Sequence, residues 1–111
     1  MTRPLLNLSA ALTLLVVSTN LARADAIDGD WCAAEGNLHM TIHGADITTP
    51  GGKQIKGNYT RHAFDYVVPD GEAGAGETVN ILLRGEYLAV SRQGASDAPL
   101  KEWRRCAMRT S

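Results

Sequence analysis

The chain has 111 residues, a formal net charge of −1 and 44% apolar residues. This length accommodates one small domain. It excludes a multi-span membrane protein and a two-domain enzyme with a separate cofactor domain. The charge excludes a strongly basic nucleic-acid-binding protein, so we expect no nucleic-acid partner.

The first 24 residues have the pattern of a secretory signal peptide. A short basic start at 1–3 precedes an apolar run at 5–17, and Ala22-Arg23-Ala24 supplies the small-x-small pattern that a signal peptidase needs. A membrane-spanning helix takes about 20 apolar residues, so this run is too short to be a comfortable anchor. We therefore predict a cleaved signal peptide at 1–24 and one mature domain at 25–111. The mature protein is expected to be periplasmic or secreted, without a transmembrane anchor.

The mature part contains two cysteines, Cys32 and Cys106. Export places cysteines where disulfides persist, and two cysteines allow only one intramolecular pairing. The alternatives are a catalytic thiol or an intermolecular bridge; a CxxC redox pair is absent. We expect a structural disulfide, which stabilises a loop of this length by about 4 kcal/mol in the chain-entropy model.

Alternation of apolar and polar residues predicts strands and almost no helix. The alternation is clearest at 38–43, 64–68 and 79–83. In chain order, the expected strands are 27–33, 38–43, 47–49, 53–61, 64–68, 79–83, 87–91 and 100–106. Glycine, proline and asparagine separate them at intervals of about ten residues, which is typical of an antiparallel meander.

The two ends of the mature chain are expected to lie side by side. The disulfide requires it, and acidic residues near the first strand face basic residues near the last. These are Asp25, Asp28, Asp30 and Glu35 against Lys101, Arg104, Arg105 and Arg109. A meander whose end strands meet closes into a barrel. We thus predict an all-β, small antiparallel meander, closed or nearly closed into a barrel, with first and last strands joined by the disulfide. Trp31 and Trp103 are expected to cover the disulfide and plug one end of the core. The basic last segment is alternatively an anion-binding or membrane-binding patch.

The segments GDWC at 29–32 and WRRC at 103–106 resemble those of small exported bacterial proteins of uncharacterised function. The resemblance covers nearly all the mature chain, including TPGG at 49–52 and GNYTRH at 57–62, and it implies no activity. More loosely, the Gly-x-Trp on the first strand is similar to the opening of lipocalin-like barrels, whose tryptophan closes the barrel floor. The chain is also loosely similar to small disulfide-closed periplasmic inhibitors of lysozyme and of secreted proteases.

The densest cluster of polar and aromatic residues is the candidate binding site. It consists of Tyr59, Arg61, His62 and Asp65. Arg61 and His62 fall at an expected turn between two strands, where side chains are exposed and function often resides. The alternative is an ordinary charged hairpin end.

Other candidate sites are weaker. His39 and His43 project from one face of a strand and are the candidates for half a metal site, or else two solvated histidines. The chain has no Gly-x-Ser-x-Gly elbow, and the glycine-rich stretch 71–76 lacks the Lys-Ser/Thr of a phosphate-binding loop. We therefore expect no catalytic residues and no cofactor.

The function expected from these features is that of an exported binding module, an inhibitor or an envelope accessory protein. It would act as a monomer on an unidentified protein or envelope component through loops at 50–53, 61–65 and 70–77. A domain this small is expected to leave little room for a pocket. The alternative is a small metal-binding protein or enzyme that uses His39, His43 and His62.

Overall fold

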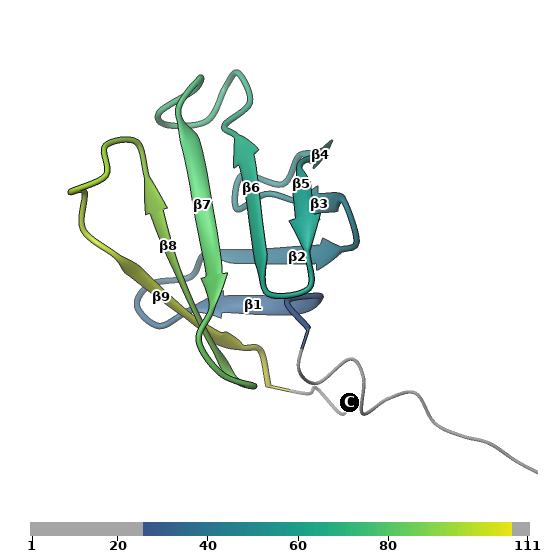
Figure 1. Cartoon of the computed structure of the whole chain (residues 1–111). Coiled ribbons are helices and arrows are strands. Elements are labelled where there is room, and N and C mark those ends of the chain that lie inside the picture. Colours follow the sequence, from purple (N-terminus) through teal and green to yellow (C-terminus); the bar gives the residue numbers. More distant parts are fainter. Residues whose placement is uncertain (1–25, 108–111) are drawn as a thin grey trace, which may run out of the picture.

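The computed structural model describes residues 26–107, and the predicted signal peptide at 1–24 lies outside them. Within 26–107, all of the regular secondary structure consists of β-strands (Figure 1). The strands are β1 (Gly29–Ala33), β2 (His39–His43), β3 (Asp46–Thr48), β4 (Gln54–Lys56), β5 (Asn58–Thr60), β6 (Ala63–Val67), β7 (Thr78–Leu83), β8 (Leu88–Gln93) and β9 (Lys101–Arg105). The all-β prediction is confirmed. A search of 26–107 for a helix that could cross a membrane finds none.

The strands form a single antiparallel sheet in the order β4-β3-β2-β1-β9-β8-β7-β6-β5. Figure 1 shows the sheet curling around an interior, with β1 and β2 running across the direction of β6, β7 and β8. The first strand, β1, pairs with the last, β9, and Trp31 lies opposite Arg105. The predicted meander in a nearly closed barrel is therefore confirmed.

The predicted disulfide is also confirmed. Cys32 and Cys106 are bonded, with their Cα atoms 5.1 Å apart across a sequence separation of 74. The Cys106 amide also donates a hydrogen bond to the carbonyl oxygen of Asp30, at 3.1 Å. The bond thus fastens the residue after β9 to the middle of β1.

The two edge strands of the sheet, β4 and β5, follow each other in the chain and are separated by Gly57. The sequence predicts one strand at 53–61, but the structure divides it, so that β4 pairs with β3 and β5 pairs with β6. The Gly57 amide donates to the carbonyl oxygen of Ala45 at 2.9 Å. A Cβ atom here would lie 2.5 Å from the Phe64 ring and would also meet the carbonyl oxygen of Asp65. Only glycine permits this approach at the point where the chain changes partners.

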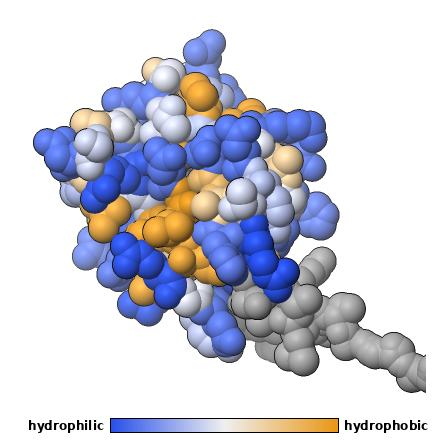
Figure 2. Space-filling view, viewed as in Figure 1, coloured by the Kyte–Doolittle hydropathy of each residue, from blue (hydrophilic) through white to orange (hydrophobic). Residues whose placement is uncertain are grey.

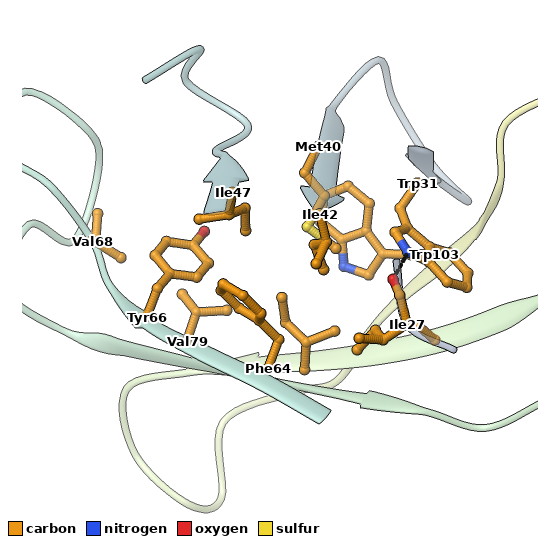
Figure 3. Close-up of a cluster of buried hydrophobic side chains, with 12 residues drawn as sticks. Ile27, Trp31, Met40, Ile42, Ile47, Phe64, Tyr66, Val68, Val79 and Trp103 are labelled. Carbon is orange, nitrogen blue, oxygen red and sulfur yellow. Dashed lines mark hydrogen bonds between the residues drawn. The ribbon is translucent and has the colours of Figure 1, made fainter. Parts of the chain in front are cut away.

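The core is built from the inward-facing residues of both halves of the sheet. Phe64 and Tyr66 of β6 point toward side chains of β2 and β3 (Figure 3). Trp31 and Trp103 are both buried among them. Successive strand residues point to opposite faces, so Cys32 leaves β1 on the side away from Trp31. Both tryptophans therefore pack in the core. The prediction that they cover the disulfide is wrong.

Arg105 fastens the residues that precede β1. Its guanidinium donates to the carbonyl oxygens of Ala26 and Asp28, at 2.7 and 2.5 Å, and to that of Glu86 at 2.7 Å. Burial lowers the pKa of Arg105, and the nearby Asp28 carboxylate acts in the opposite direction. Among the described residues, Arg105 of the basic end thus donates hydrogen bonds to backbone carbonyl groups of the acidic end, and its charge also interacts with Asp28.

The outer surface carries one apolar area on the face shown in Figure 2, over β7 and β8. Leu82 of β7 lies opposite Val90 of β8, and Leu100 borders the same depression. Leu82 and Leu100 are both exposed. Polar residues surround this area on the viewed face.

Candidate functional site

One end of the barrel contains a cavity of about 530 Å³, which we call the mouth cavity. Residues of three connecting segments, 49–53, 68–77 and 94–100, border it together with residues of β2, β6, β7, β8 and β9. Pockets that bind small molecules have volumes of roughly 300 to 1,000 Å³, so this one accommodates a small organic molecule. The prediction that the domain leaves little room for a pocket is wrong.

The cavity exists because of the side chains that the strands direct into the barrel. Trp31 and Phe64 fill the interior at the end fastened by Arg105. Toward the other end, Val68, Val79 and Ser91 are much smaller, and Met40, Tyr66 and Trp103 form walls around the space that they leave. The walls are mainly apolar and include two buried side chains with hydroxyl groups, as is typical of small-molecule sites.

Tyr66 supplies the first polar group. Its side chain is only 5% exposed, and its hydroxyl makes no hydrogen bond within residues 26–107. Burial, assisted by the negative charge of Glu72, raises the pKa of Tyr66 to about 12. The hydroxyl is therefore a neutral donor at physiological pH. Buried polar groups without a partner are rare in proteins, so this one is unusual.

Ser91 supplies the second polar group. It is buried, and its hydroxyl oxygen accepts a hydrogen bond from the indole Nε1 of Trp103 at 2.9 Å. The contact fixes the indole ring along the cavity wall. Since the oxygen acts there as acceptor, the hydroxyl proton stays available to a group inside the cavity. Sequence reasoning missed Ser91 and Tyr66 because alternation identifies both simply as core positions.

Hydrogen bonds hold the loop between β6 and β7 at the entrance of the mouth cavity. The carboxylate of Glu72 accepts a hydrogen bond from the Thr49 hydroxyl at 2.5 Å. A Cβ atom at Gly51 would lie 2.5 Å from the same carboxylate, so the glycine makes room for it. Lys53 donates to the carbonyl oxygen of Asp70. These contacts hold the 68–77 loop against the 49–53 loop.

Two further side chains complete the rim. Gln93 of β8 donates to the Ala73 carbonyl at 3.1 Å and to Glu77 at 2.9 Å, which fixes the other flank of the loop. Lys101 of β9 places its ammonium 5.8 Å from the centre of the Trp103 ring. Within residues 26–107, Lys101 makes no ion pair.

The four residues of the predicted binding cluster lie at the other end of β6, on the β5–β6 hairpin. Tyr59 donates its hydroxyl proton to the Asp28 carboxylate, and Asp65 accepts a hydrogen bond from Asn58 at 2.8 Å. Arg61 and His62 occupy the turn, and the Arg61 carbonyl oxygen accepts from the amide of Ile27 at 2.7 Å. The hairpin therefore supports the residues that precede β1. Its role in binding stays a prediction.

Asp28, which the sequence suggests only as a charge partner of the last segment, connects two further elements at this end. Burial raises the pKa of Asp28. Hydrogen bonds from the Tyr59 hydroxyl and, at 2.8 Å, from the Gly44 amide lower it by more, so that the pKa lies below its ordinary value. The nearby charge of His43 acts in the same direction. The hydrogen bond to Asp28 raises the pKa of Tyr59. Asp28 thus joins the β2–β3 turn to β5.

His39 and His43 lie on β2 with exposed side chains, and His62 lies on the β5–β6 turn. Among residues 26–107, no three His, Cys, Asp or Glu side chains are grouped so that they could hold a metal ion. A metal site made from these histidines would need ligands from another molecule or from residues beyond that range.

Known proteins give no independent assignment of either end of the barrel. The resemblances drawn from the GDWC and WRRC segments therefore stay predictions. Comparison of the chain with protein-family models, with curated proteins and with solved structures found no match in any of the three.

Proposed function

We propose that the protein is an exported binding module that holds a small amphipathic ligand in the mouth cavity. The observation that carries the proposal is the Tyr66 hydroxyl, which is buried, protonated and without a hydrogen-bond partner in residues 26–107. A ligand oxygen in the cavity would accept the hydroxyl proton in place of water.

The arrangement of the loops supports the same proposal. Of the three loops expected to carry binding, those at 50–53 and 70–77 contribute residues to the cavity, and the one at 61–65 lies at the opposite end of β6. Connecting loops on a rigid sheet are a common location of binding sites. Export through the segment at 1–24, to the periplasm or the medium, and a monomeric state belong to this proposal. Action as an inhibitor or envelope accessory protein would follow from ligand occupancy.

The test is an amide NMR titration of the mature protein with 2-(1-naphthyl)ethanol, an uncharged probe with an apolar body and one oxygen. We expect saturable shifts at Val68, Val79 and Ser91, and none at Arg61 or His62. Shifts confined to the hairpin at 61–65 would place the binding site there and contradict the proposal, as would the absence of saturable shifts.

A pair of variants separates cavity binding from surface binding. Val79→Phe fills the cavity from β7, whereas Val67→Phe adds the same ring at a position of β6 that is 57% exposed. Loss of probe binding in the first variant only, with near-ultraviolet circular dichroism unchanged, supports the proposal; equal binding by both overturns it. If Val79→Phe does not fold, Tyr66→Phe is the replacement, because it retains the ring and removes only the hydroxyl. It should weaken binding about fivefold.

A further inference from the structure

Two buried hydroxyl groups of the mouth cavity have protons to donate. The Tyr66 hydroxyl has no partner, and the Ser91 hydroxyl already accepts from Trp103, so each has a proton to donate. A ligand that satisfies both must present oxygen or another acceptor. An amine would offer further donors and leave the hydroxyl protons unused.

Lys101 adds a positive charge on the same side. Residues alternate along β9, so Lys101, Trp103 and Arg105 lie on the inner face of the sheet, where Trp103 is buried and Lys101 is exposed at the rim. Glu102 and Arg104 face outward, where they form an ion pair at 3.5 Å. Lys101 is the inward residue nearest the start of β9, and it lines the mouth cavity.

The other charged side chains at the rim make hydrogen bonds within residues 26–107, although Glu72 keeps its negative charge. Lys53 donates to the Asp70 carbonyl, and the Glu72 carboxylate accepts from the Thr49 hydroxyl. Lys101 contacts only the face of the Trp103 ring, at 5.8 Å, among residues 26–107. Its ammonium group therefore retains its donors for an anion at the cavity entrance.

We propose that the ligand is an organic acid with a compact apolar body, bound with its carboxylate by Lys101 and the cavity hydroxyls and with its body against the Trp103 ring. This inference rests on the proposed function and specifies its ligand class. A carboxylate matches the charge of Lys101, and its oxygens match the donors of the cavity. The aromatic wall favours a ring as the apolar body.

The experiment compares three probes that share one ring and differ in charge: 1-naphthaleneacetate, 2-(1-naphthyl)ethanol and 2-(1-naphthyl)ethylamine. Titration calorimetry of the mature protein at pH 7 and low salt measures the three dissociation constants. We expect the acid to bind about three- to tenfold more tightly than the alcohol, since a hydrogen-bonded charge pair at a partly exposed rim is of moderate strength. The amine should bind most weakly.

Two variants on one strand assign the preference to Lys101. Lys101→Gln should reduce the acid-to-alcohol ratio of affinities to about one. Arg104→Gln removes a positive charge from the outer face of β9, three residues after Lys101. It should leave the ratio of affinities unchanged. An equal fall of the ratio in both variants would show a general effect of net charge and overturn the assignment.

The outcomes also separate this inference from the function on which it rests. Equal binding of the acid and the alcohol would preserve the mouth cavity as a binding site and overturn the preference for acids. Tighter binding of the amine would do the same. If none of the three probes binds, the proposed function itself is contradicted.

Discussion

The guanidinium carbon of Arg105 lies 4.3 Å from the centre of the Trp31 ring, in the geometry of a cation–π contact. The two residues are direct partners across β1 and β9. Gly29 belongs to the same arrangement, because it has a φ of +130° and a Cβ atom there would lie 2.6 Å from the Arg105 guanidinium. Together with the disulfide, these contacts lock the first strand to the last.

This lock gives the GDWC and WRRC segments a structural explanation. Gly29 leaves space for Arg105, Trp31 supports its guanidinium, and the two cysteines bond. Residues of both segments therefore join β1 to β9. They say little about what the barrel binds, which is consistent with a resemblance that implies no activity.

The contacts between β1 and β9 predict that the two adjacent arginines of β9 contribute unequally to the free energy of unfolding. Arg105→Ala should reduce the free energy of unfolding by about 2 to 4 kcal/mol, because it removes hydrogen bonds to three carbonyl groups and the contact with Trp31. Arg104→Ala should cost less than about 0.5 kcal/mol, since it removes only an exposed ion pair. Urea unfolding of both variants measures the difference, and equal losses would contradict the lock.

The close approach of the chain at Gly57 predicts a second contrast. Gly57→Ala should destabilise the fold by about 1 to 3 kcal/mol, because the new methyl group meets Phe64 and the Asp65 backbone. Gly85→Ala is the matched control: neither glycine has a positive φ, and no atom lies within 4 Å of a Cβ at Gly85. Thermal unfolding should show a lower Tm for Gly57→Ala only. An unchanged Tm would mean that the barrel does not need this close approach.

Most of the fold is predictable from the sequence because the relevant signals are the local alternation of apolar and polar residues and the number of cysteines. Alternation identifies the strands, and two cysteines allow one intramolecular bond. The break at Gly57 escapes prediction because a glycine within an alternating segment is compatible with a continuous strand. The residues that a side chain at Gly57 would meet, Phe64 and Asp65, come later in the chain and approach Gly57 only in the folded barrel.

The candidate site is less predictable for a related reason. Alternation places Tyr66 and Ser91 inside, but it does not reveal whether a hydroxyl inside finds a partner. That depends on which residues the closed barrel brings near it, such as Trp103 beside Ser91. The hairpin residues attracted attention because they are charged and clustered, and the structure engages Tyr59 and Asp65 in hydrogen bonds with Asp28 and Asn58.

Two tyrosine variants test whether these hydroxyls differ as described. Tyr59→Phe should cost about 1 kcal/mol at pH 7, because it removes the hydrogen bond to Asp28. Tyr66→Phe should be neutral or stabilising by up to about 1 kcal/mol, because it removes a buried hydroxyl that has no partner in residues 26–107. Urea unfolding at pH 7 distinguishes them. A comparable loss in Tyr66→Phe would reveal a partner for that hydroxyl.

The same tyrosine predicts a loss of stability in alkali. The pKa of Tyr66 is about 12 in the folded protein, against about 10 for an unfolded tyrosine. The neutral form is therefore favoured by folding, and its contribution is complete below pH 10 and is lost as the pH rises through 12. Wild type should lose more stability than Tyr66→Phe between pH 10 and 12. Parallel curves would contradict the burial of this group.

Asp28 predicts a loss of stability in acid. Its pKa is lowered in the folded state, so its contribution is present above the unfolded value of about 3.9 and is lost as the pH falls through the folded value. Asp28→Asn should cost about 1 to 2 kcal/mol at pH 7 and should flatten the decline of stability below pH 4. Asp97→Asn, on the exposed 94–100 loop, is the control and should follow wild type. If the stability of Asp28→Asn declined below pH 4 as steeply as that of wild type, Asp28 would not be a source of the acid sensitivity.

The central claim is that the buried Tyr66 hydroxyl serves a ligand in the mouth cavity. The most direct measurement is calorimetric titration of 1-naphthaleneacetate into wild type, Tyr66→Phe and Tyr87→Phe, the last at a position that is 68% exposed. The account predicts about fivefold weaker binding in Tyr66→Phe and unchanged binding in Tyr87→Phe. Equal affinity in all three proteins, or no binding to wild type, would contradict it.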